Sequence, residues 1–527
     1  MSRINLTQAQ TTEYDICVIG AGAAGLALAF ALGRSGLRVL VIEQGGFDPG
    51  EIDTTDTRDE IVSPQTHDPR QRTNREAVAG TLMGWGGRCM PFDPEDFAAG
   101  SPRHVHPWPI PFEDYARWVT PAAEFLDTDP VFHEPAPPGW PAVEGVNVER
   151  VERLNALEQA DDLQDRLKQG DAPVDLLSHA QLLSMCWEDS AENRVHALQI
   201  LQDGQTATLP CRQVVLACGG LESTRLLLLE QAAQPSVFQG SSEALGRYYM
   251  GHLTGAVAEI TFRDPEICDG FGYRSENGQS PYRRRFVLTG ETPSNVAFWV
   301  ENLAPSDPRH GSGEISAKHL LKHSERFQNP APHIANILRD PVGMFDAMRA
   351  GANRLSAAAA RRPQRLVAHG RGPYALAYHA EHFPEHDSRV MLSDSTDRTG
   401  RCRLKVDFRY GQRTVQALVD SHKLLARRLQ AGNAAEMVLP EDDTLAEAII
   451  KKSRDGYHQI GLTRMSDDPK DGVVNTNCRV YGTENLFVAS ASVFPVSGQA
   501  NPTLSVVAMA LRLADHIQDQ HRTGSAT

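Results

Sequence analysis

Two side chains near the C-terminal end of the chain are suited to acid–base chemistry, those of His458 and Asn501. A neutral imidazole can accept the proton of a reacting hydroxyl group near neutral pH. An amide does not titrate, but it can hydrogen-bond an oxygen atom and fix its orientation. The residue types leave two alternatives open. His458 could be a structural histidine, and Asn501, which precedes Pro502 and an apolar helix predicted to run to about Ile517, could be a helix cap.

The sequence offers no comparable set of residues for other chemistries. It contains no Gly-x-Ser-x-Gly turn for a serine nucleophile. Its eight cysteines are scattered and form no Cys-x-x-Cys pair, a pattern that predicts no metal site, reduced thiols and a cytoplasmic protein. Three consecutive arginines, Arg283 to Arg285, are predicted to lie in a solvated loop, and the alternative is a contact for an acidic or sugar-phosphate substrate.

A glycine-rich turn near the N-terminus predicts an element that binds a dinucleotide. The turn stands between a buried strand and an apolar helix, and an acidic residue ends the next strand. In order these are Ile16–Ile19, the turn residues Gly20, Gly22, Ala23 and Gly25, the helix Leu26–Leu32, the strand Val39–Ile42 and Glu43. The glycines would let backbone N–H groups approach a pyrophosphate, and the Glu43 carboxylate would hold a ribose hydroxyl.

The chain contains no second complete turn of this type. Gly270–Gly272 and Gly311–Gly313 both lack the third glycine and a following helix. A flavin reductase that draws hydride from NAD(P)H commonly has two such units, so the pattern favours a single FAD. A second buried strand, Gln213–Ala217, runs into Gly219 and Gly220 and is suited to lie beside the same cofactor.

Composition and charge exclude several classes of partner. The 527 residues include 52 Lys and Arg against 67 Asp and Glu, a formal charge of −15. This balance excludes nucleic acid as the main partner and argues against anionic membranes. No uninterrupted apolar run is long enough to cross a bilayer. We therefore expect a small-molecule substrate and no membrane partner, and the composition leaves a homo-oligomer open.

The order of the expected elements predicts an α/β fold combined with an α+β fold. Segments 1–128, 170–255 and 450–527 would form a discontinuous Rossmann-type FAD-binding domain, 129–169 a surface insertion or lid, and 256–449 an inserted substrate-binding domain on an antiparallel sheet with helices. In the last segment the predicted strands are Ala256–Thr261, Val296–Glu301, Ser388–Asp394 and Arg403–Phe408, and the predicted helices are Ala317–Arg326 and Gln412–Ala431.

Together these motifs resemble the glucose-methanol-choline (GMC) family of FAD-dependent oxidoreductases. Besides the N-terminal turn, the resemblance rests on Gly80-Thr81 with Trp85-Gly86-Gly87, on Leu216–Gly220 with Arg225, and on the block from His458 to Asn501. These segments cover both ends of the chain. The middle of the chain matches loosely, chiefly at Glu381, Pro384 and Ser388–Val390.

The resemblance implies roles for individual residues. His458 falls on the catalytic histidine of the family and Asn501 on its second catalytic position, a pair that resembles the pyranose oxidase and glycoside oxidase-like branch. The implied cofactor contacts are Gly80, Thr81, Gly84, Trp85, Gly86, Ala217, Gly219, Ser490, Pro502 and Thr503. In pyranose oxidases a histidine just before the tryptophan bonds covalently to FAD. Gly84 stands at that position here, so we expect non-covalent FAD.

The resemblance also implies a reaction, the oxidation of a secondary alcohol on a sugar or glycoside to the ketone. Hydride would pass to flavin N5 and the proton to His458, and oxygen or another electron acceptor would reoxidise the flavin. Two alternatives remain. One is a GMC-type tailoring dehydrogenase that acts on a non-sugar alcohol of a natural product, and the other is a flavin-binding protein that is not a catalyst.

Overall fold

One half of the molecule is built on a five-stranded parallel sheet. The computed structural model describes residues 3–48, 59–98, 106–155, 159–188, 193–238, 243–275, 279–322, 330–341, 366 and 372–524. The sheet has the strand order β20-β11-β1-β2-β7, with β1 at Ile16–Ile19, β2 at Val39–Ile42, β7 at Asp175–Leu177, β11 at Gln213–Leu216 and β20 at Leu486–Val488. These strands are almost entirely buried, as their continuous apolar runs require.

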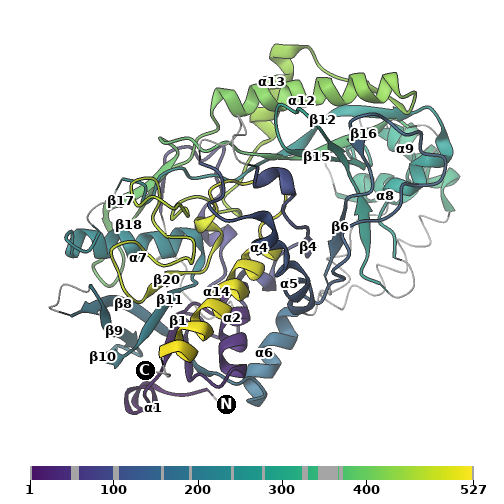
Figure 1. Ribbon diagram of the computed structural model, residues 1–527. Helices are drawn as coiled ribbons and strands as arrows, with labels where there is room; N and C mark the ends of the chain where they lie inside the picture. The colour runs from purple at the N-terminus through teal and green to yellow at the C-terminus, as the bar shows by residue number, and fades with distance from the viewer. Residues whose placement is uncertain are drawn as a thin grey trace.

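Helices cover this sheet, and two of them lie side by side (Figure 1). These are α2 (Ala23–Arg34) and α14 (Thr503–Gly524), which share one hydrophobic core with the strands. The other helices of this half are α1 (Leu6–Thr11), α3 (Arg70–Thr73), α4 (Phe112–Ala116), α5 (Val119–Phe125), α6 (Gln159–Gln169) and α7 (Gly219–Ala233).

A six-stranded sheet forms the second half, and its pairs are antiparallel. The strand order is β19-β12-β16-β15-β14-β5, with β5 at Val146–Asn147, β12 at His252–Phe262, β14 at Phe286–Leu288, β15 at Val296–Glu301, β16 at Tyr374–Glu381 and β19 at Ala435–Val438. Helices α12 (Gln412–Ala431) and α13 (Asp442–Lys452) pack on it (Figure 1). In α12 the buried residues recur at helical spacing, for example Val415, Leu418, Leu425 and Leu429.

Three smaller sheets complete the fold. They are β13-β6-β4 (Tyr282–Arg284, Val151–Leu154, Arg88–Cys89), β10-β9-β8 (Gln205–Pro210, Val195–Gln202, Ala180–Trp187) and β17-β18-β3 (Arg389–Thr396, Cys402–Asp407, Glu60–Ile61). Strands β17 and β18 pack on α7, on the side of the parallel sheet. Segment 129–169 supplies β5, β6 and α6 and is thus partly built into two sheets.

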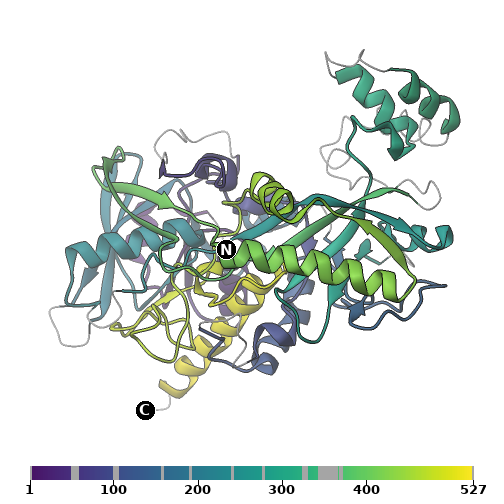
Figure 2. The same cartoon turned by 90° about the horizontal axis from the view of Figure 1, so that it is seen from above.

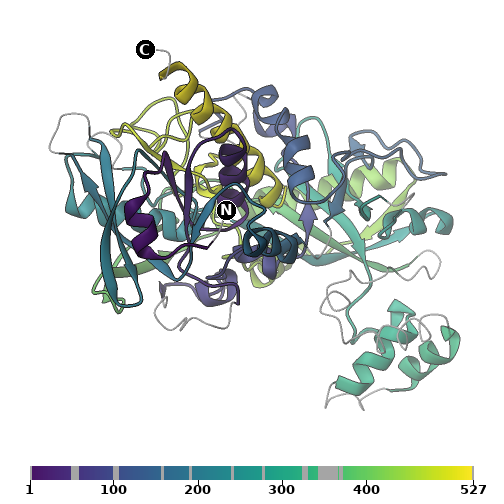
Figure 3. The ribbon, with the colours of Figure 1, turned by 90° about the horizontal axis from the view of Figure 1, so that it is seen from below.

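Helices α8 (Gly313–Lys322) and α9 (Pro330–Arg339) pack on each other and stand away from the sheets (Figures 2 and 3). The predicted helix Ala317–Arg326 overlaps α8, and its last four residues lie outside the described residues. No helix in the described part of the chain is long and apolar enough to cross a membrane. The predicted combination of a Rossmann-type parallel sheet with an antiparallel sheet and helices is confirmed.

Candidate active site

The glycine-rich turn joins β1 to α2 at the carboxyl end of the parallel sheet. A Cβ atom on Gly20 would lie 2.7 Å from the Ala217 carbonyl oxygen, and one on Gly25 would lie 2.1 Å from the Gly20 carbonyl oxygen. A Cβ atom on Gly22 would meet no atom within 4 Å. The first and third glycines therefore allow close backbone packing, whereas the second faces open space where α2 begins. No side chain caps that helix, so its start is suited to bind an anion.

Glu43 follows β2 and is held beside this turn. Its Oε2 atom accepts a hydrogen bond from Ala21 N at 2.8 Å, and its Oε1 atom accepts one from Gly45 N at 2.8 Å. Burial raises the pKa of Glu43 to about 7, although both backbone hydrogen bonds oppose the shift. The carboxylate is thus placed at the mouth of the turn, where a ligand hydroxyl would find an acceptor.

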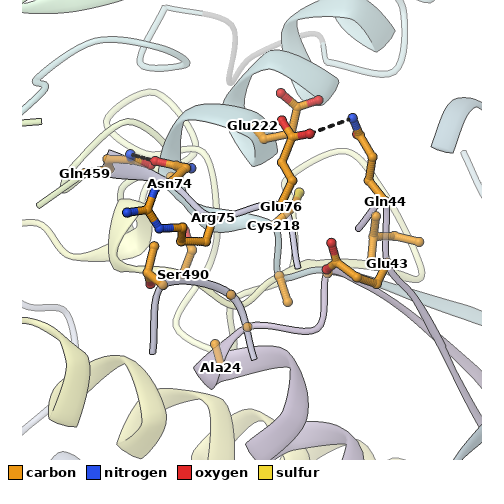
Figure 4. Close-up of a pocket in the computed structure, with 18 of the residues that line it drawn as sticks. Ala24, Glu43, Gln44, Asn74, Arg75, Glu76, Cys218, Glu222, Gln459 and Ser490 are labelled. Carbon is orange, nitrogen blue, oxygen red and sulfur yellow. Dashed lines mark hydrogen bonds between the residues drawn. The ribbon is translucent and has the colours of Figure 1, made fainter. Parts of the chain in front are cut away.

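A pocket extends from Glu43 to the start of α14 (Figure 4). Gln44 Nε2 donates to Glu76 at 3.2 Å across one end of it, and Gln459 Nε2 donates to the Asn74 side chain at 2.7 Å across the other. The predicted cofactor residues that line this pocket are Gly20, Gly22, Ala23, Glu43, Gly80, Thr81, Ala217, Gly219, Ser490, Pro502 and Thr503. The structure thus brings together residues from both ends of the chain.

The other predicted site residues lie outside this lining. Gly25 is buried against Gly20, and Trp85 packs against the main hydrophobic core. Gly84 and Gly86 are exposed. His458 and Asn501 are not lining residues either, but each has neighbours that are: Tyr457 and Gln459 flank the histidine, and Pro502 follows the asparagine.

One wall of the pocket is charged, and only one of its residues appeared among the sequence motifs. Arg70 pairs with Glu222 at 2.5 Å and with Asp59 at 2.7 Å, and Arg225 pairs with Asp397 at 2.5 Å. Glu222 and Asp397 lie 152 and 172 residues from the arginines with which they pair, so no local pattern marks them. Arg225 alone stood beside a recognisable glycine turn.

Three histidine rings meet where the parallel sheet half and the antiparallel sheet half join. His252 and His379 come from the paired strands β12 and β16, and their rings stack at a centroid distance of 4.1 Å. His458 comes from the loop after α13, and its ring stands nearly perpendicular to that of His252, at 4.7 Å. The two Nδ1 atoms of His252 and His458 lie 2.9 Å apart. Only His458 was singled out by sequence reasoning.

The three rings contain donor nitrogens within 4.8 Å of one another, a spacing at which metal sites occur. A metal ion binds an imidazole in the plane of its ring. The His252 and His379 rings are only 28° from parallel and are stacked, so their lone pairs do not converge on one point in the gap between the rings. The geometry therefore favours a hydrogen-bonded cluster over a metal centre.

Asp455 lies next to His458, and both of its carboxylate oxygens accept hydrogen bonds. Its Oδ1 atom accepts from the backbone N–H groups of Gly456, Tyr457 and His458 at 2.8, 2.9 and 3.0 Å. Its Oδ2 atom accepts from His252 N at 2.6 Å and lies 3.2 Å from His458 Nδ1. Burial opposes ionisation, but His458, His252 and these N–H groups lower the pKa of Asp455 below its ordinary value.

The segment that leads to Asn501 lies across two of the rings. The Ser497 carbonyl oxygen is 3.3 Å from His252 Nε2, and the Gln499 carbonyl oxygen is 2.8 Å from His379 Nδ1. Asn501 Oδ1 is buried and has no hydrogen-bond partner among the described residues, and α14 begins two residues later at Thr503. A helix cap would accept a hydrogen bond from the first turn of α14, and Asn501 Oδ1 accepts none from the described residues. The structure therefore gives no support to the alternative that Asn501 is only a cap.

The prediction that the arginine run lies in a solvated loop is wrong. Arg283 and Arg285, expected in a solvated loop, are buried in β13 and just before β14, and both donate to Glu152 of β6. Arg88 joins them at 2.8 Å. Burial alone would raise the pKa of Glu152, but the three guanidinium groups hold it well below its usual range. Arg285 also donates to Gln499 at 2.6 Å, which ties this cluster to the histidines.

Comparisons with known proteins agree with the fold and with FAD as the cofactor. The family model "GMC oxidoreductase" matches residues 384–510, and the model "FAD dependent oxidoreductase" matches residues 15–217. The fructose dehydrogenase large subunit of Gluconobacter japonicus is 24% identical over 64% of this chain and 53% of its own length, so the chain spans about half of that relative.

Two further proteins are similar over nearly the whole chain. The 6'''-hydroxyparomomycin C oxidase of Streptomyces lividus is 22% identical over 96% of this chain and 92% of its own. The crystal structure of a pyridoxine 4-oxidase from Mesorbium loti has a TM-score of 0.53 at 18% identity, covering 96% of this chain and 99% of that one, and shares its fold. The chain therefore combines an FAD-dependent oxidoreductase domain, matched over residues 15–217, with a GMC oxidoreductase C-terminal domain, matched over residues 384–510.

Proposed function

We propose that the protein oxidises an alcohol, and more narrowly a secondary hydroxyl group on a sugar or glycoside to the ketone. FAD, when bound, supplies the hydride acceptor. The relatives named fructose dehydrogenase and 6'''-hydroxyparomomycin C oxidase support this substrate class. The observation that carries the proposal is the place of His458. It stands between two residues that line the cofactor pocket, and its Nε2 atom has no hydrogen-bond partner among the described residues.

In this proposal His458 Nε2 accepts the hydroxyl proton of the substrate. A positioned general base contributes about 10²–10⁴-fold to such a step. Asn501 orients the substrate oxygen with its amide. Its buried Oδ1 atom lacks a partner, which costs about 1–3 kcal/mol, and a donor group of a bound ligand would remove that cost.

The residues present fit an FAD. The turn at Gly22 leaves room for a pyrophosphate, Glu43 offers an acceptor to a ribose hydroxyl, and the pocket continues to Thr503 at the start of a second helix. We propose that the FAD is held without a covalent bond, since Gly84 has no side chain to attach it. Acid precipitation of the purified protein should then release all yellow colour into the supernatant.

The reaction can be tested with an anaerobic visible spectrum of the purified protein. The holoenzyme would be titrated with monosaccharides, glycosides, polyols and simple alcohols, each in matched primary and secondary forms. Bleaching of the flavin by a secondary sugar alcohol is the expected result. Bleaching by non-sugar alcohols alone would favour the tailoring dehydrogenase, and no bleaching by any alcohol would contradict the proposed function.

Admitting air after bleaching would identify the electron acceptor. Fast recolouring would indicate an oxidase, and slow recolouring that a quinone or dye accelerates would indicate a dehydrogenase. For the compartment, we propose the cytoplasm, because all eight cysteines are free and five of them are buried.

A further inference from the structure

We propose that His252 and Asp455 are positioning residues that fix the tautomer of His458, so that its Nδ1 atom carries the proton and its Nε2 atom is bare. This inference rests on the proposed function, in which Nε2 is the atom that takes the substrate proton. A neutral histidine has two tautomers, and only the one with a bare Nε2 can act as that base. The hydrogen bonds around Nδ1 therefore decide whether the site is active.

The first constraint comes from His252 and begins at a backbone carbonyl. The Ser497 carbonyl oxygen accepts hydrogen bonds only, so His252 Nε2, at 3.3 Å, must carry a proton. Burial, and then the neighbouring His458, lower the pKa of His252 well below its ordinary value, so the ring is neutral. A neutral ring has one N–H group, and His252 Nδ1 is therefore an acceptor. The hydrogen at the 2.9 Å contact must belong to His458 Nδ1.

The second constraint comes from Asp455 and is independent of the first. Four backbone N–H groups donate to this carboxylate, so it stays ionised and can only accept. Its Oδ2 atom lies 3.2 Å from His458 Nδ1, and that contact also requires a proton on Nδ1. The two neighbours of Nδ1 thus demand the same tautomer, and the one hydrogen is shared between them.

Asp455 has a further effect once the base has taken its proton. The imidazolium of His458 then lies beside a carboxylate, whose charge stabilises it. The other groups that face the cluster do not replace this charge. His379 stacks on His252 with a pKa well below its ordinary value, lowered first by burial, and Arg88 and Arg285 are cations that act in the same direction on His379. Asp455 is thus an anion in direct contact with the histidine cluster.

The direct test is the position of the proton on His458. Protein labelled with ¹⁵N-histidine distinguishes bare from protonated ring nitrogens by chemical shift, in the cofactor-free and the FAD-loaded protein alike. The His458 signals are identified by their loss in His458→Ala. We expect protonated Nδ1 and bare Nε2 in the unsubstituted protein. A proton on Nε2 there would overturn the proposal.

Asp455→Asn should weaken the preference for this tautomer, because only His252 then requires a proton on Nδ1. The asparagine can keep its oxygen on the three loop N–H groups, which turns its NH₂ group toward His458 Nδ1 and opposes a proton there. The expected result is an increased share of protonated Nε2 in the spectrum and a rate constant of flavin reduction lowered by about 10- to 100-fold. An unchanged tautomer with an unchanged rate would contradict the role of Asp455.

His252 provides a second pair of variants that does not depend on Asp455→Asn folding. His252→Ala removes the acceptor and should lower the rate constant of flavin reduction about tenfold, the value of one hydrogen bond of roughly 1.4 kcal/mol. His252→Asn can place an oxygen where Nδ1 was and should restore most of the rate. His422→Asn is the matched control, because His422 is equally buried in α12 and, among the described residues, hydrogen-bonds the Leu418 carbonyl alone.

The outcomes separate this inference from the proposed function. If His458→Ala still reduces its flavin normally with substrate, the proposed function fails. If His458→Ala is inactive while His252→Ala and Asp455→Asn both reduce flavin at the normal rate, only the tautomer proposal fails. Equal losses in His252→Ala and His252→Asn, with the control unaffected, would show that packing and not the acceptor matters, and would also overturn it.

Discussion

The pocket and the histidine cluster next to it are built in different ways, and they are called below the nucleotide end and the histidine end of the site. The nucleotide end is formed mainly by the backbone. It consists of a glycine turn, the start of a helix and one carboxylate that two backbone N–H groups hold in place. At the histidine end, side chains and backbone groups from four separate segments meet, at residues 252, 379, 455–458 and 497–501. The first end is local in sequence and the second is long-range.

This difference predicts different failures on substitution. Backbone N–H groups are present whatever the side chain, so the nucleotide end fails when a new Cβ atom occupies the space that a ligand or the backbone needs. The histidine end depends on the protonation of single nitrogen atoms, so it fails when one hydrogen-bond partner changes. Variants at the two ends should therefore separate cofactor binding from substrate oxidation.

The largest effect is expected for His458→Ala. Loss of the base should lower the rate constant of flavin reduction by about 10²–10⁴-fold, measured by anaerobic stopped flow. The affinity for FAD, measured by fluorescence titration of the apoprotein, should stay within about twofold, since His458 does not line the nucleotide end. A variant that loses its FAD as well would show that the two ends are not separable.

The glycine turn offers a matched pair. Gly25→Ala should lower the free energy of unfolding by about 3 kcal/mol, because its Cβ atom would lie 2.1 Å from a backbone oxygen. Gly22→Ala should leave the unfolding free energy nearly unchanged and weaken FAD binding about tenfold, or 1.4 kcal/mol, because its Cβ atom points into the ligand space. Equal stability losses in the two variants would refute the distinction drawn between these glycines.

Asn501→Ala should stabilise the apoprotein and slow the reduction of the flavin. Removal of the buried, unpaired Oδ1 atom should raise the free energy of unfolding of the apoprotein by about 1 kcal/mol, measured by urea denaturation. The rate constant of flavin reduction should fall about tenfold, because the substrate oxygen loses a hydrogen-bonding partner. A destabilised apoprotein would instead indicate that the asparagine serves the fold.

The smallest effect is a pH dependence of FAD binding through Glu43. Its pKa of about 7 means that the carboxyl group is largely protonated at pH 6 and ionised at pH 8. A ribose hydroxyl donates to the ionised form, so FAD should bind more tightly at pH 8 than at pH 6, by at most about tenfold. Glu43→Gln should remove this dependence. Binding that is tighter at pH 6 would contradict the assigned role.

The sequence allowed the nucleotide end to be predicted because its parts are contiguous. A strand, three glycines, a helix and Glu43 lie within 28 residues, and each has a pattern of its own. Strand β15 and helix α12 were likewise predicted with the bounds that the structure has, since their apolar periodicity is local. The order of the strands in the antiparallel sheet could not be predicted, because no local pattern indicates which strands pair.

The histidine end was only partly predictable. His458 and Asn501 stand in a family motif, but His252, His379 and Asp455 belong to no local pattern that separates them from structural residues. The arginine run was misread for a related reason. A series of charges normally indicates solvent, and only the tertiary fold places Glu152 where it compensates Arg283 and Arg285.

The packing of α2 on α14 also determines which ligands the pocket can accept. Both helices begin at the pocket, with Ala23 at one start and Thr503 at the other, and they contact each other along the sheet, where Gln518 Nε2 donates to the Ala31 carbonyl at 3.4 Å. The separation of the two helix starts is therefore set by the protein and not by the ligand. A ligand that engages both helix starts must carry a ring system beyond its phosphates, so ADP, which ends at its pyrophosphate, can engage only the first.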